Sequence, residues 1–406
     1  MKFRNCSDCG KYKYIEGNGL CRSCYNKSDS NYSFSYESPL DRLDNTNNGH
    51  QLVIGKKRSG RTVTNKIELY DAIKNSNAHV YMIDNNGEYE DLINEVGGEY
   101  FSMSAYDCLN LLHVEKSSSS QMSLATRIKR VIDLIRRCYC LTGLVMDKVR
   151  EKVLVTVIKE AYSNNGIELQ PSTHTNPSPT ISDVIDMLDD LRSNPKKFPK
   201  YKSYNDKRKI KATLKHLHLE LRDIDNRLGI RDNIGRDFSK KNVVCFDISP
   251  IKSMNIRGVR VQMLLNEIFE YAKTNSEKNL LYVDDCETLF SAPSSTLQSI
   301  PTIFRHGSSE DLGVCLSTRD SHGIITSDTF QSLCNIVQYR RIHRMTSTTD
   351  DIQKILQLSD KQYAESSKLQ VGGGKNDESK VLFSGSKGDK HSKESIKIDD
   401  RMFSKI

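Results

Sequence analysis

Short apolar segments with strand character recur along most of this chain, and segments with a helical pattern separate them. Apolar runs of this kind are typical of strands buried on both faces of a parallel sheet, with helices covering each face. The sequence therefore predicts an α/β fold with a mostly parallel sheet. The predicted strands cover residues 52–54, 79–83, 100–103, 243–246, 280–283, 314–317 and 336–339.

The strand pattern is interrupted between about residues 121 and 231. Apolar residues in this region follow helical spacing, so that their side chains share one face of a helix. The clearest series is Leu124, Ile128, Val131, Ile132 and Ile135. We therefore expect an all-helical insertion within a single α/β core.

Two Cys-x2-Cys pairs lie close to the N-terminus. Cys6 and Cys9 form the first pair, and Cys21 and Cys24 form the second after eleven intervening residues. Four thiolates presented by two tight turns complete a tetrahedral shell for zinc and leave no open position for a catalytic water. The spacing predicts a structural Zn2+ ribbon. Two disulfides, or four unrelated thiols, are the less favoured alternative for a cytosolic chain.

The chain is expected to divide into consecutive parts. Residues 1–30 are the predicted zinc ribbon, and residues 31–50, which include a Ser-, Asn- and Asp-rich stretch, are a linker. Residues 51–115 and 236–400 are the two parts of the α/β core. The helical insertion occupies residues 116–235 between them, and residues 401–406 are a tail.

Charge and hydropathy limit where the chain acts and what it binds. No run of about 18 apolar residues occurs, and the N-terminus lacks the apolar stretch of a signal peptide. A cytoplasmic location without a transmembrane segment is expected. The formal net charge of +8 is compatible with a polyanionic partner such as DNA. Later cysteines, such as Cys245 and Cys315, lie in apolar segments and are expected to be reduced core thiols.

The segment after the first predicted strand has the glycine spacing of a Walker A phosphate-binding loop. In that loop, backbone N–H groups cradle the phosphates of a nucleotide, a Lys reaches the β and γ phosphates, and a Ser or Thr holds magnesium. A simple glycine turn is an equally common origin of such spacing. The residues expected to bind ATP are Gly55, Ser59, Gly60, Arg61 and Thr62.

One residue of this loop differs from the standard pattern, because Arg61 stands where the Lys belongs. Arg keeps the positive charge, but its guanidinium is longer and planar, so the exchange is not conservative. We expect nucleotide binding to tolerate the exchange better than hydrolysis does. A less favoured alternative is that Lys56 or Lys57 reaches back to the phosphates.

An apolar strand that ends in two acids, Asp284 and Asp285, resembles the Walker B element. The first carboxylate organises magnesium through water, and the second polarises the attacking water. We therefore expect Mg2+ at Thr62 and Asp284, and a catalytic role for Asp285, which is one methylene shorter than the usual Glu. Glu287 is an alternative second acid, although an exposed loop acid is the favoured interpretation.

Several segments occur in an order that resembles the HerA–FtsK superfamily, and most closely the type IV secretion and conjugative transfer ATPases of the VirB class and TraC-like type. The hallmark is the strand-Asp-x-x-Gly-Glu-Tyr segment at residues 79–89, followed by Gly-Gly-Glu at residues 97–99. The resemblance covers about residues 51–400. The other matching segments are residues 91–92, 109–110, 179–183, 244–249, 284–285, 304–307 and 314–319.

The resemblance implies a RecA-like P-loop core that assembles into a hexameric ring and binds ATP between subunits. It also implies a motor that couples ATP hydrolysis to translocation of DNA or protein in conjugation, secretion or virus genome packaging. A membrane-bound secretion or packaging partner would place the ring peripherally at a membrane. Arg305 matches the family's arginine near the neighbouring subunit, which resembles an arginine finger, and a surface arginine is an equal alternative. Arg319 takes the place of the sensor Gln.

Three departures at one site leave alternatives open. Arg61, Asp285 and Arg319 together motivate a degenerate homologue that binds nucleotide, or serves as an assembly or adaptor subunit, without efficient hydrolysis. A zinc-ribbon DNA-binding regulator is a third hypothesis, but it leaves the ordered α/β segments unexplained. Lysines between residues 192 and 215, including Lys196 and Lys200, interleave with aromatic residues; they indicate a DNA-binding surface or a solvated charged surface equally well.

Overall fold

The computed structural model describes two units, residues 1–38 and residues 39–406. In the first unit, β1 (Phe3–Asn5) and β2 (Tyr12–Tyr14) pair antiparallel. The four cysteines of the predicted zinc ribbon lie outside the described residues. The described residues are 3–5, 12–14, 49–105, 107, 109–114, 124–168, 176–198, 207–230, 241–274, 277–290, 299–320, 322–337, 339–345, 350–369, 378–385 and 393–397.

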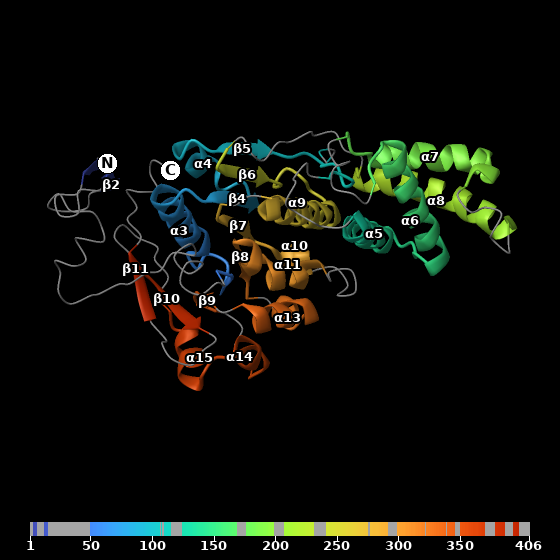
Figure 1. Cartoon of the computed structure of the whole chain (residues 1–406). Coiled ribbons are helices and arrows are strands. Elements are labelled where there is room, and N and C mark those ends of the chain that lie inside the picture. The colour runs from blue at the N-terminus through green and yellow to red at the C-terminus, as the bar shows by residue number, and fades with distance from the viewer. Residues whose placement is uncertain are drawn as a thin grey trace. The chain divides into compact units, whose positions relative to one another are not determined.

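A nine-stranded sheet forms the centre of the second unit, with the order β11-β10-β9-β3-β8-β7-β4-β6-β5 (Figure 1). The run from β9 to β5 is parallel, and β10 and β11 add an antiparallel edge. The predicted α/β fold with a mostly parallel sheet is confirmed. The strands are β3 (Gln51–Gly55), β4 (His79–Asp84), β5 (Glu99–Ser102), β6 (Val243–Asp247), β7 (Asn279–Asp284), β8 (Leu312–Arg319), β9 (Tyr339–Ile342), β10 (Glu378–Gly385) and β11 (Lys393–Lys397).

The strand predicted at residues 336–339 is displaced in the structure. Ile336 ends helix α13 (Asp328–Ile336), and β9 begins only at Tyr339. The Ser327 hydroxyl accepts a hydrogen bond from the Phe330 N–H and caps this helix, while Phe330 and Leu333 are buried. A short apolar run does not distinguish the end of a buried helix from the start of a buried strand, which explains the error.

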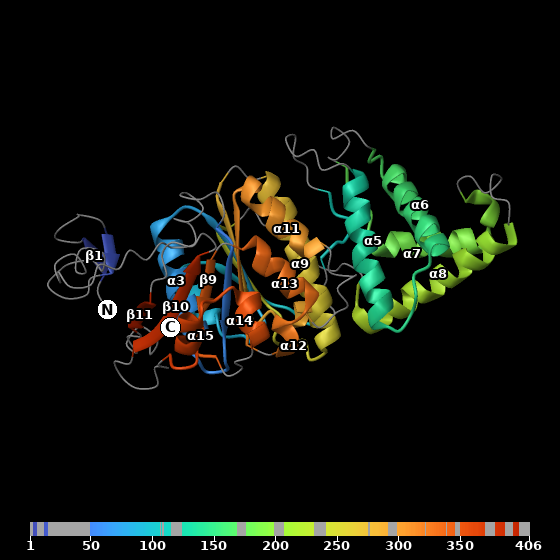
Figure 2. The ribbon, with the colours of Figure 1, turned by 90° about the horizontal axis from the view of Figure 1, so that it is seen from below.

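Helices cover both faces of the sheet (Figures 1 and 2). Helix α3 lies on one face, and α9, α11 and α13 lie on the other. None of the helices in the described part of the chain combines the length and the apolar character that a bilayer crossing requires. Outside the insertion, the helices of this unit are α3 (Arg61–Asn75), α4 (Glu90–Glu95), α9 (Met254–Thr274), α10 (Glu287–Phe290), α11 (Ser299–Gly307), α12 (His322–Ile325), α14 (Asp350–Leu356) and α15 (Asp360–Ser366), besides α13.

The predicted all-helical insertion is confirmed between β5 and β6. It contains α5 (Leu124–Leu141), α6 (Lys148–Asn164), α7 (Ile181–Ser193) and α8 (Lys207–Leu228). The five apolar residues that predicted α5 are all buried. At the start of α7, Thr180 and Asp183 form a capping box, in which each side chain accepts a hydrogen bond from the other residue's backbone N–H. Sequence pattern thus determines these helices locally.

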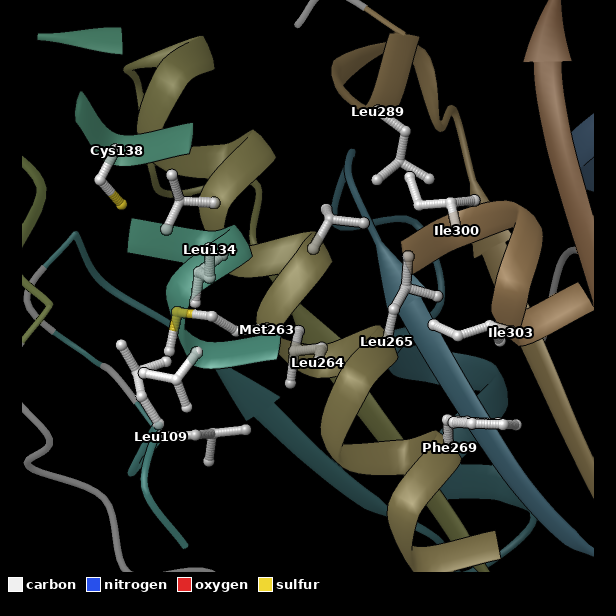
Figure 3. Close-up of a cluster of buried hydrophobic side chains, with 14 of the residues drawn as sticks. Leu109, Leu134, Cys138, Met263, Leu264, Leu265, Phe269, Leu289, Ile300 and Ile303 are labelled. Carbon is white, nitrogen blue, oxygen red and sulfur yellow. The ribbon is translucent and has the colours of Figure 1, made fainter. Parts of the chain in front are cut away.

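Helix α9 belongs to the core and packs against helix α5 of the insertion. Figure 3 shows Met263 facing Leu134 of α5, while Leu265 faces Ile300 and Ile303 of α11. The same α5–α9 contact also contains a buried ion pair, in which the Arg127 guanidinium contacts the Glu267 carboxylate. The interface between the insertion and the core therefore consists of apolar side chains packed around a buried ion pair.

Replacing Glu267 by Ala is expected to lower the free energy of unfolding by about 3 kcal/mol, because the Arg127 charge would stay buried without this carboxylate. The matched control is Asp223→Ala, which removes the exposed partner of Arg227 on α8 and should cost less than about 1 kcal/mol. Urea denaturation followed by circular dichroism measures both changes. Equal losses would show that the Arg127–Glu267 pair does not stabilise the interface.

Candidate nucleotide site

The parallel register brings the ends of four strands to one edge of the sheet. Gly55 at the end of β3 pairs with Arg319 of β8, and Asp84 at the end of β4 pairs with Asp284 of β7. Strands β7 and β8 are neighbours, and the Cys286 N–H donates to a backbone carbonyl of β8. The predicted phosphate loop and the paired acids, although distant in sequence, therefore meet at the carboxyl edge, where ligands bind in open α/β sheets.

The loop at residues 56–60 has a tightly constrained backbone. Gly60 precedes α3 with φ 83°, in the left-handed region that favours glycine. A Cβ added to Gly55 would lie 2.5 Å from the Cβ of His343 and 2.8 Å from the Oγ of Ser59. Glycine is therefore required at the start of the loop by close packing and at its end by backbone conformation.

His343, immediately after β9, contacts both this loop and the first turn of α3. Its Nδ1 lies 3.1 Å from the Ser59 carbonyl oxygen, and its Nε2 lies 3.2 Å from the Thr64 hydroxyl. Because a carbonyl oxygen can only accept, Nδ1 carries the proton. Burial, with the Arg341 charge adding to it, lowers the pKa of His343 well below its usual value, so the ring is neutral at pH 7. Sequence pattern did not indicate His343, because its partners Ser59 and Thr64 are distant in sequence.

Arg61, the first residue of α3, contacts the paired acids and β8. One guanidinium nitrogen donates to the Asp285 carboxylate at 2.8 Å, and another donates to the Ser317 hydroxyl at 3.1 Å. The Arg61 side chain is only 7% exposed. Its charge is thus directed at the second acid of the predicted Walker B element.

Asp285 is held by three donors. Besides Arg61, it accepts from the Asn86 amide at 2.8 Å and from the Arg319 guanidinium at 3.1 Å. Burial alone would raise the pKa of Asp285, but the Arg61 charge and these hydrogen bonds outweigh it and lower that pKa. Asp285 also has φ 46°, a left-handed conformation that is uncommon for Asp.

The three positions that depart from the family pattern therefore form one connected chain of ion pairs: Arg61, Asp285 and Arg319. Arg319 extends it through a 3.0 Å contact between its Nε and a Glu287 carboxylate oxygen. The expectation that Glu287 is an exposed loop acid is wrong, because this residue begins α10 and its side chain is only 24% exposed. Burial is the main cause that raises the pKa of Glu287.

Asp284 lies next to Thr62. The Thr62 hydroxyl is 3.4 Å from one carboxylate oxygen, and the Tyr89 hydroxyl donates to that same oxygen at 3.0 Å. The Asn65 amide is 3.3 Å from the other oxygen. Burial, with the neighbouring Asp285 charge adding to it, raises the pKa of Asp284. Tyr89 lies in the hallmark segment at residues 79–89, but neither Tyr89 nor Asn65 was predicted as a site residue.

Arg305 lies apart from this cluster within the chain. It is an exposed residue near the end of α11, which leads into the amino end of β8. Its neighbour Phe304 contacts His50, which precedes the amino end of β3, with ring centroids 5.0 Å apart. The candidate site is at the opposite, carboxyl end of both strands. The structure therefore does not bring Arg305 together with the other predicted site residues of the same chain.

The strand order, the β3–loop–α3 unit and the position of Asp284 at the end of β7 are those of a RecA-like α/β core. The fold is similar to that of VirB4 of Thermoanaerobacter pseudethanolicus, with a TM-score of 0.67 and 16% identity over 86% of this chain and 89% of that one. The plasmid coupling protein TrwB in complex with the ATP analogue ADPNP gives a TM-score of 0.61 and 11% identity over 95% of this chain and 93% of that one.

TrwB in complex with ADP and Mg2+ gives a TM-score of 0.60 and 12% identity over 93% of this chain and 92% of that one. No protein-family model matches this sequence, and no curated protein matches it. The predicted likeness to secretion and conjugation ATPases is thus confirmed at the level of the fold.

Proposed function

We propose that this chain is an ATP-binding motor that couples nucleotide hydrolysis to translocation of DNA or protein, of the conjugation, secretion or genome-packaging type. The observation that carries the proposal is the meeting of the loop at residues 56–60 and the acids Asp284 and Asp285 at one edge of the sheet. The likeness of the fold to VirB4 and to TrwB, which was solved with nucleotides, supports it.

The loop residues fit a triphosphate. The first turn of α3 has no side-chain cap, so its backbone N–H groups are suited to donate hydrogen bonds to an anion. The Ser59 hydroxyl is buried and has no hydrogen-bond partner among the described residues, which suits a site where a phosphate oxygen would bind. A Cβ on Gly55 would lie 2.8 Å from this hydroxyl oxygen, so glycine at position 55 leaves the hydroxyl room.

Magnesium fits between Thr62 and Asp284. Both residues offer hard oxygen ligands, and their oxygens lie 3.4 Å apart. When bound, Mg2+ would supply charge neutralisation of the phosphates. Within the chain, the Thr62 hydroxyl and the Asp284 carboxylate would hold and orient it.

Arg61 has two competing anionic partners in this account. It contacts Asp285 in the structure, and a triphosphate on the loop would lie next to its first helical turn. Nucleotide binding therefore requires that Arg61 exchange the carboxylate for phosphate oxygens. After that exchange Asp285 would keep its hydrogen bonds to Asn86 and Arg319, and its carboxylate would be the group that polarises the attacking water.

Purified protein is expected to release phosphate from ATP in the presence of Mg2+, and Arg61→Ala and Asp285→Ala should each reduce the rate at least about tenfold, because each removes a charged group next to the reacting phosphate. Asp223→Ala on α8 is the control with an equally small side chain and should keep the rate. A wild-type rate no higher than that of the two site variants would favour the alternative, a nucleotide-binding or adaptor subunit.

We propose a homo-oligomeric ring, hexameric as in the family that the sequence resembles. Arg305 supports this proposal, because it is exposed at the amino edge of the sheet, away from the nucleotide site of its own chain. It could reach a transferring phosphate only in a neighbouring subunit, as arginine fingers supplied in trans do. A cytoplasmic ring beside a membrane-bound secretion or packaging partner remains part of this proposal.

DNA is the translocated substrate that the surface charge favours. The first half of α8 carries five exposed cations and no acid before Glu220, namely Lys207, Arg208, Lys209, Lys211 and Lys215. Cations at a helix N-terminus interact unfavourably with the helix dipole. A bound polyanion would neutralise these cations, which favours binding and also stabilises the helix. Lys196 and Lys197 lie in the segment before α8, where Lys197 contacts Asp190; Lys200 is outside the described residues.

Reversing the charge of Lys207, Arg208 and Lys211 together should weaken DNA binding and reduce the slope of log affinity against log salt by about 3, because each cation that neutralises a phosphate releases about one counterion. The control reverses three exposed lysines of α6, Lys148, Lys152 and Lys159. Fluorescence anisotropy at several salt concentrations measures both slopes. A change no larger than that of the α6 variant would exclude this surface.

We also propose that Cys6, Cys9, Cys21 and Cys24 bind structural Zn2+. The support is their spacing, together with the pairing of β1 and β2, which flank the first cysteine pair in the sequence. In the part of the chain that the structure describes, no group of three or more His, Cys, Asp or Glu residues is arranged to hold a metal ion. Zinc bound per chain, compared between wild type and Cys6→Ser, tests this proposal.

A further inference from the structure

The loop between β4 and α4 is folded around one buried carboxylate. Asp84 accepts hydrogen bonds from the backbone N–H groups of Asn86 at 2.9 Å, Gly87 at 2.8 Å and Tyr89 at 3.0 Å. Gly87 has φ 74°, which permits the tight turn. Burial raises the pKa of Asp84 to about 6, so at pH 7 it is mostly ionised and accepts all three bonds.

The far side of this loop is fixed to β6 and α9. The Arg257 guanidinium donates to the Asn85 carbonyl at 3.2 Å and to the Ser249 carbonyl at 2.7 Å. A Cβ on Gly87 would lie 2.8 Å from the Ser249 hydroxyl oxygen, so the loop packs closely against the residues after β6. The loop is thus held on both sides before it contacts the nucleotide site.

From this fixed loop, three side chains contact Asp284, which ends β7, and Asp285, which follows it. The Tyr89 hydroxyl donates to an Asp284 carboxylate oxygen at 3.0 Å, and the Asn85 amide donates to the Asp284 carbonyl at 2.6 Å. The Asn86 amide donates to Asp285 at 2.8 Å. Tyr89 and Asn85 are buried, whereas Asn86 is exposed, so both contacts with Asp284 are shielded from water and the contact with Asp285 is not. Of the two shielded contacts, only that of Tyr89 is with the Asp284 carboxylate.

We propose that Tyr89 is a positioning residue that sets the orientation of the Asp284 carboxylate for the metal that accompanies the nucleotide. The oxygen that accepts from Tyr89 is the oxygen that faces the Thr62 hydroxyl, so fixing one fixes the distance to the other. This inference rests on the proposed nucleotide site and adds a residue to it.

A tyrosine that only fills the core would act differently from a positioning tyrosine. Loss of packing would weaken nucleotide binding with and without magnesium alike. Loss of the hydroxyl alone, with the ring kept, should weaken only the magnesium-dependent part, because it frees the Asp284 carboxylate to rotate. Tyr89→Phe separates these two cases.

The experiment compares wild type, Tyr89→Phe and Tyr81→Phe, using a fluorescent ATP analogue with Mg2+ or with a chelator. Tyr81 is an equally buried tyrosine on β4, and it packs against His79 and Tyr271 away from the acids. Tyr89→Phe is expected to raise about tenfold the Mg2+ concentration for half-maximal binding, since a hydrogen bond to a charged group is removed. Affinity in chelator should be unchanged, and Tyr81→Phe should match wild type in both conditions.

An unchanged Mg2+ dependence in Tyr89→Phe would overturn the inference, as would an equal loss with and without Mg2+. If the melting temperature of Tyr89→Phe is well below that of Tyr81→Phe, Tyr89→Phe is tested again in a protein that also carries Asp284→Asn. In that double variant, Tyr89→Phe should cause no further change in Mg2+ dependence, because the carboxylate that it positions is absent. An additive change would contradict the positioning role. Failure of wild type to bind the analogue at all would contradict the proposed nucleotide site itself.

Discussion

Parallel pairing of β3, β8, β7 and β4 is the constraint on which the rest of the molecule depends. Backbone hydrogen bonds of this ladder align Gly55 with Arg319 and Asp84 with Asp284, so side chains from distant parts of the sequence share one sheet edge. The strands are buried on both faces, and a slip of one residue would exchange the side chains packed on one face with those packed on the other. This register brings the loop before α3 together with Asp284, which ends β7, and Asp285, which follows it.

At that edge, the charged side chains are held by ion pairs with one another. Arg61 and Arg319 each form an ion pair with Asp285. The Arg61 guanidinium reaches from the first residue of α3 both to Asp285 and to the Ser317 hydroxyl of β8. Two arginines from different elements therefore share one carboxylate.

Sequence pattern was sufficient for the parts governed by local periodicity. The strands β4, β6 and β7, the apolar face of α5 and the capping box at Thr180 follow directly from residue spacing. Tertiary contacts account for what it missed. Nothing adjacent in sequence shows that His343 lies beneath the phosphate loop, that Tyr89 reaches Asp284, or that Arg61 contacts the second acid. These contacts exist only once the sheet has formed.

The most direct experiment is a structure of the protein with a non-hydrolysable ATP analogue and Mg2+. We expect the phosphates to lie over Ser59 and the first turn of α3, with the metal beside Thr62 and Asp284. Arg61 would have left Asp285 for the phosphates. An analogue bound elsewhere, or Arg61 still paired with Asp285 beside an analogue whose phosphates do not contact the loop, would contradict it.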